Sequence, residues 1–154
     1  MTDDELHDAI LANPAAKAMA DAGNDSGAAA AIAAKLPPEI VPNTFLNERS
    51  IVAIFPNPGD GEAALQGFEA AAQSNPLFAR VVRWLKPEAG GVDFGLASTR
   101  ASLDILRKAN ALTPEAVARL KAVAERPATV DPNQVSAAWL RYRPDGKVVT
   151  DANG

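Results

Sequence analysis

The sequence predicts an all-α protein, a compact array of about seven short helices with an extended, proline-rich linker and a polar C-terminal tail. Three observations lead to this prediction. Much of the 47% apolar fraction is alanine, the best helix former. Apolar residues recur at helical spacing in successive segments, and 12 prolines and 10 glycines separate those segments. The β-branched segment 50–55 also suits a strand, but no partner strand is evident, so helix is favoured.

An acidic, helical N-terminal segment is predicted over residues 1–36. A first helix over 3–11 carries acidic residues in its first turn, which suits the positive end of the helix dipole. Asn13 and the proline after it break or restart this helix, and a second helix follows over 15–22. A cap at Asp25 or Ser26 begins a third, alanine-rich helix.

An extended linker with a short helix or strand is predicted over residues 37–60. Because the residue before a proline avoids the α region, 37–44 should be extended. Thr44 or Asn47 then caps the short helix, and a Pro/Gly-rich loop follows in which Asp60 caps the next helix.

A helical body is predicted over residues 61–140, followed by a tail over 141–154. Its hairpin, 98–126, begins with a helix capped by Ser98, and the connection has the length of a helix-turn-helix. The first turn of the second helix offers no base-reading side chain, so a plain αα-hairpin is predicted. Before the hairpin, the glycines around 90–95 frame a loop that we expect to be mobile or to accommodate a ligand.

The composition excludes several kinds of site and targeting segment. There is no cysteine, which excludes disulfides and thiolate metal sites. The acidic N-terminus lacks the basic and apolar regions of a signal peptide. No apolar run is long enough to cross a bilayer. We therefore expect a soluble cytoplasmic product without membrane association.

No catalytic residue, metal site or cofactor is predicted. The single histidine, His7, lies among acidic residues, a pattern more typical of a solvated helix face than of a metal site. Glu62 and Glu69 lie two turns apart on one predicted helix face. They offer the carboxylate pair of a small wall-degrading hydrolase, but a helix-dipole partner and a surface acid are the favoured interpretation.

Charge and aromatic residues predict docking surfaces. Residues 1–75 carry three Lys/Arg and eleven Asp/Glu, a charge of −8, and residues 76–154 carry twelve and eight, a charge of +4. Such polarity can orient one subunit against the next, although two solvated faces of opposite sign remain open. A basic stripe of Arg80, Arg83 and Lys86 adjoins Trp84, and a second basic-aromatic cluster begins the tail. The candidate interface residues are Arg80, Arg83, Trp84, Phe94, Trp139, Arg141, Tyr142 and Arg143.

Nucleic acid is not the expected partner of these basic groups. Arginine and lysine side chains contact phosphates, but the pI of about 5.0 and the 5% aromatic content argue against such a role. An acidic neighbouring subunit, such as the N-terminal region of another copy, is the favoured partner.

Several motifs resemble small structural-region proteins of tailed bacteriophages. They are Asn75-Pro76, VVRWLKP at 81–87, GGVDFG at 90–95, STR at 98–100 and the later Leu-Thr-Pro-Glu-Ala helix start. The resemblance covers residues 15–140. It implies a non-enzymatic virion protein without cofactors, made in the host cytoplasm and assembled as a symmetric oligomer in a tail, baseplate or neck.

The partners implied are copies of the chain itself and other virion proteins. The linker, as an arm over 36–47, and the tail over 141–154 would reach adjacent subunits. The alternative is a phage assembly or regulatory factor that binds a protein partner, or less readily nucleic acid, without entering the virion.

Overall fold

The computed structural model, which describes residues 1–141, confirms the all-α fold class. Nine α-helices, one 3₁₀ turn and two short antiparallel strand pairs lie within these residues. The chain divides into two compact units: the first comprises residues 1–38 and those from 127 onward, and the second comprises residues 39–126. The second unit is thus inserted in the sequence of the first.

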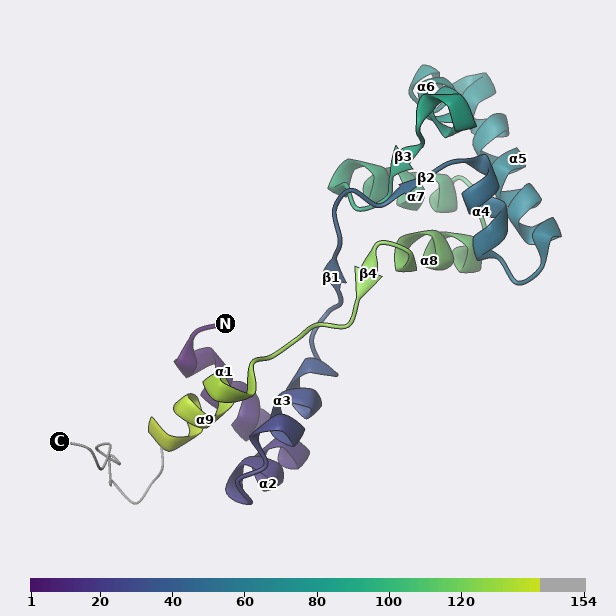
Figure 1. Ribbon diagram of the computed structural model, residues 1–154. Coiled ribbons are helices and arrows are strands. Elements are labelled where there is room, and N and C mark those ends of the chain that lie inside the picture. The colour runs from purple at the N-terminus through teal and green to yellow at the C-terminus, as the bar shows by residue number, and fades with distance from the viewer. Residues whose placement is uncertain (142–154) are drawn as a thin grey trace. The chain divides into compact units, whose positions relative to one another are not determined.

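The first unit is a group of four helices from both ends of the chain (Figure 1). Its helices are α1 (Asp3–Ala12), α2 (Pro14–Asp21), α3 (Asp25–Ala33) and α9 (Pro132–Arg141). Alanine dominates the buried faces of α2 and α3, so these helices pack closely but supply little apolar volume. Val135 and Trp139 of α9 complete the core against Leu6 and Ile10 of α1. The structure therefore groups the last predicted helix with the N-terminal segment rather than with residues 61–131.

The second unit holds the larger core. Its helices are α4 (Glu48–Ile54), α5 (Pro58–Ser74), α6 (Pro76–Leu85), α7 (Ala97–Lys108) and α8 (Pro114–Ala122), with a 3₁₀ turn at Pro87–Ala89. The helical interpretation of 50–55 is confirmed by α4. The strands are two residues each, and their pairs are β1 (Glu39–Ile40) with β4 (Glu125–Arg126), and β2 (Phe45–Leu46) with β3 (Val92–Asp93).

Asparagine followed by proline starts several helices. Asn13, Asn57 and Asn75 each accept a backbone N–H in the first helical turn, and the proline after each occupies the first helical position. The prediction that Asp60 caps the fifth helix is wrong, because α5 begins at Pro58 and so includes Asp60 in its first turn. Ser98 is likewise not a cap, since α7 begins at Ala97.

The hairpin of α7 and α8 is confirmed, and ion pairs join its two arms. Arg100 on α7 donates to the carbonyl oxygen of Lys121 at 3.0 Å and pairs with Glu125. Lys121 in turn lies 2.7 Å from the carboxylate of Asp104. These contacts therefore fasten the open end of the hairpin, where α7 begins and α8 ends.

The extended linker is held by its own unit through Asp93. This carboxylate is only 6% exposed. It accepts the backbone N–H groups of Asn43 at 3.0 Å, Thr44 at 2.9 Å and Gly95 at 2.8 Å. Residues 39–46 are therefore held against their own unit and are not a free arm.

The glycine-framed loop also differs from its prediction. A Cβ atom on Gly95 would lie 2.2 Å from the carbonyl oxygen of Val41, and one on Gly91 would lie 2.6 Å from that of Leu46. Glycine is required at both positions because two backbone segments touch there. The loop is therefore packed against the linker at these two glycines.

Candidate docking surface

Helix α6 presents an exposed apolar and basic face. Phe78 and Leu85 are buried on its opposite side. Leu77 and Trp84, seven residues apart and therefore on one edge of the helix, are 51% and 50% exposed. Arg80 and Arg83 are exposed between and beside them. We call Leu77, Arg80, Arg83 and Trp84 the α6 surface.

An apolar cleft adjoins the α6 surface. Its volume is about 150 Å³, and its walls include Phe68, Phe78 and Phe94, with Leu77 and Trp84 as part of the lining. The hydroxyl-bearing residues of the first turns of α7 complete it. An apolar cavity of this size accommodates a benzene-sized group. The cleft can therefore receive one apolar side chain of a partner.

The charges beside the cleft have no partner within the described chain. Arg80 and Arg83 make no hydrogen bond or ion pair with any residue among 1–141. Lys86, by contrast, is bound to Glu48, and this hydrogen bond raises the pKa of the Lys86 ammonium. The predicted basic stripe is thus reduced to two arginines, because Lys86 is engaged inside the unit.

Two of the predicted interface residues are core residues. Phe94 is 1% exposed in the core of the second unit, and Trp139 is 7% exposed in that of the first. Both are therefore buried rather than exposed, since an alanine-rich chain with few aromatics needs its large side chains to fill the cores. Phe94 reaches the docking surface only as a wall of the apolar cleft. Arg141 is exposed and lies 3.4 Å from Asp3, whereas Tyr142 and Arg143 lie outside the described residues.

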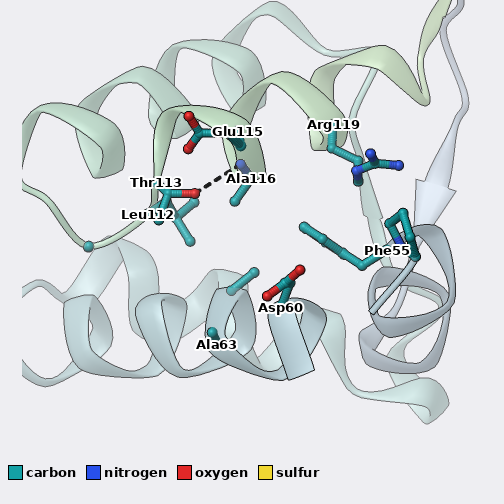
Figure 2. A pocket seen from close by; sticks show the side chains of 11 residues that line it. Phe55, Asp60, Ala63, Leu112, Thr113, Glu115, Ala116 and Arg119 are labelled. Atoms are coloured by element: carbon teal, nitrogen blue, oxygen red, sulfur yellow. Dashed lines mark hydrogen bonds between the residues drawn. The ribbon is translucent and has the colours of Figure 1, made fainter. Parts of the chain in front are cut away.

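A second cavity, of about 420 Å³, lies between α5 and α8 (Figure 2). Asp60 and Phe55 point into the space between the helices, and Glu115 and Arg119 stand on the α8 side. Arg119 donates to the carbonyl oxygen of Ile54 at 3.2 Å and lies over the Phe55 ring at 5.9 Å. Nothing in the sequence indicated this cavity.

Thr113 and three charged side chains are among the polar groups of the second cavity. The hydroxyl of Thr113 accepts the N–H of Ala116 at 3.1 Å, so it serves as the helix cap. Its charged side chains, Asp60, Glu115 and Arg119, are all exposed.

The residues considered for hydrolysis and metal binding lie in an open depression of the second unit and on α1 of the first unit. Glu62 and Glu69 line one open depression together with Glu48 and Lys86. His7 packs against Trp139, with ring centroids 5.8 Å apart, and its Nδ1 lies 3.8 Å from a carboxylate oxygen of Asp8. Within residues 1–141, no group of three or more His, Cys, Asp or Glu side chains is placed to hold a metal ion.

Comparison with known proteins gives no relative. No protein-family model, no curated protein and no solved structure matches this chain. In the part of the chain that the structure describes, no helix combines the length and apolar character needed to cross a membrane.

Proposed function

We propose that this chain is a non-enzymatic structural protein of a bacteriophage virion, a tail, baseplate or neck component that assembles as a symmetric oligomer. The observation that carries the proposal is the α6 surface: two half-exposed large apolar side chains beside an apolar cleft, with two arginines that pair with no residue in the described part of the chain.

The energetics of this surface favour a protein partner. Roughly 100 Å² of Trp84 is accessible, taking half of a tryptophan of about 200 Å². Covering that area would contribute about 2.5 kcal/mol at 25 cal/mol per Å². Tryptophan and arginine are the residues enriched at interface hot spots. The arginines orient a partner with acidic groups, and the cleft receives one of its apolar side chains.

The virion setting is supported by the sequence motifs. The Val-Val-Arg-Trp-Leu-Lys-Pro motif that resembles tailed-phage structural proteins contains Arg83 and Trp84. Motif and surface therefore coincide on α6. The GGVDFG motif, in contrast, contains Asp93 and the glycines that hold the linker, so its role is in folding.

Photo-crosslinking in assembled particles tests the proposal. A photoreactive phenylalanine analogue at Leu77, introduced during phage growth, should crosslink the chain to a particle protein. The same group at Ala118, exposed on α8, is the matched control. Mass spectrometry of purified particles should detect the chain and the Leu77 crosslink. Detection only in the infected lysate would overturn the virion assignment and favour the assembly or regulatory factor.

A further inference from the structure

We propose that the α6 surface binds helix α1 of a second copy of this chain. This inference rests on the proposed docking function and names its partner. The complementary surface is the exposed face of α1, which the first-unit core leaves uncovered. Leu6 and Ile10 face that core, and Asp4, Asp8 and Leu11 lie on the other side of the helix.

The α1 face is acidic and ends in an apolar residue. Helix α1 contains no lysine or arginine. The side chain of Asp8 is 84% exposed, and Leu11 is 49% exposed. Because these residues are three positions apart, they lie on one face of the helix. The face therefore offers acidic groups that can pair with the arginines of the α6 surface and one apolar side chain that can enter its cleft.

The spacing of the two faces matches when the helices run antiparallel. Leu11 then lies opposite Leu77 at the cleft, and Asp8, three residues earlier, lies opposite Arg80, three residues later. Each step spans about 4.5 Å along its helix. The next acid, Asp4, comes opposite Arg83 with a mismatch of one residue. Helix α6 carries two arginines and no acid, so every charged contact in this register is attractive.

This contact joins different surfaces of the two copies. Each copy that uses its α6 surface still presents α1, and the reverse also holds. Such heterologous contacts continue beyond a dimer and yield a closed ring or an open filament. The proposed oligomer is therefore cyclic or helical rather than a simple two-fold dimer.

Charge reversal with rescue tests the inference, using the full chain and light scattering after size-exclusion chromatography. Arg80→Glu with Arg83→Glu should weaken self-association at least about tenfold. Asp4→Lys with Asp8→Lys should do the same. The chain that carries all four changes should associate again, because both faces have exchanged sign. Circular dichroism confirms that each variant is folded.

Two further variants separate this contact from a general charge effect. Arg107→Glu with Lys108→Glu makes the same charge change on the exposed end of α7 and should leave association unchanged. Leu11→Gln alters no charge and should weaken association by removing the side chain from the cleft.

Failure of this inference is distinct from failure of the docking function. A wild-type chain that stays monomeric up to about 1 mM would overturn the copy-to-copy contact. The contact would also be overturned if the variant with all four charge reversals remained monomeric while the wild type associates. A Leu77 crosslink to a different particle protein would overturn the contact and leave the docking function standing.

Discussion

Replacing Asp93 by alanine should destabilise the second unit strongly. Its carboxylate is the acceptor for three backbone N–H groups, all at 3.0 Å or less. A hydrogen bond to a charged group contributes about 1.5–3 kcal/mol. Because the exposed Asn43 can turn to water once freed, the three losses should not add fully. We expect a total of about 3–4 kcal/mol for Asp93→Ala.

Asp93→Asn keeps the shape and one acceptor oxygen but directs an amide N–H₂ at a backbone donor. A loss of about 2 kcal/mol is therefore expected. Urea denaturation followed by far-UV circular dichroism gives the free energies of unfolding. Asp60→Asn, a change at an exposed aspartate of the same unit, is the control and should cost about 0.5 kcal/mol or less. If the free energy of unfolding of Asp93→Ala lay within about 1 kcal/mol of the wild-type value, the proposed role of Asp93 in holding the linker would be refuted. Water would then satisfy all three backbone donors.

Further predictions concern packing and capping. Gly95→Ala should cost about 2–3 kcal/mol, because its Cβ would overlap a backbone carbonyl 2.2 Å away. Gly90→Ala meets no atom within 4 Å and should cost only about 1 kcal/mol for its positive φ; equal losses on thermal melting would contradict this contrast. Trp139→Phe should cost about 1–2 kcal/mol and Trp139→Ala about 3–5 kcal/mol, because the indole N–H makes no hydrogen bond with any residue among 1–141. A larger loss for phenylalanine would indicate a polar role for the indole. The Glu5 pKa should lie below its ordinary 4.5, because the carboxylate accepts the Thr2 backbone N–H. This stabilising contribution is present above 4.5 and is lost as pH falls through the lowered pKa. Thr2→Ala removes the side-chain hydrogen bond of Thr2 but keeps its backbone N–H, so NMR titration of this variant should show the Glu5 pKa only part of the way back towards 4.5.

The local features of this fold were predictable because their signals are local. Thr113 and the following proline mark the start of α8, and the structure places the helix there. The cap of α5 was predicted wrongly. The proline after Asn57 indicates that the helix starts there, with Asn57 as its cap. The exposure of Trp84 could also be predicted from helical spacing, because Trp84 lies on the same edge of α6 as Leu77 and away from the buried Leu85.

Features that depend on distant segments could not be predicted. Phe94 is buried because β3 pairs with β2, some 47 residues earlier in register. Trp139 is buried because α9 packs on helices from the other end of the chain. Trp84 and Trp139 both lie near arginine in the sequence, so that pattern does not show which of them is buried. Only the packing of segments that are remote in the sequence decides whether such an aromatic side chain is buried in a core or exposed on the surface.

The insertion of one unit within the sequence of the other sets an order of events during synthesis. About 100 residues separate the end of α3 at Ala33 from the start of α9 at Pro132. At about 5–20 residues per second, α1 to α3 wait roughly 5–20 s for the helix that completes their core. The inserted unit finds all its packing partners within residues 39–126, so it folds during that interval. The nascent N-terminal helices are therefore exposed longest, and a chain stalled before residue 132 carries a finished unit and an unfinished one.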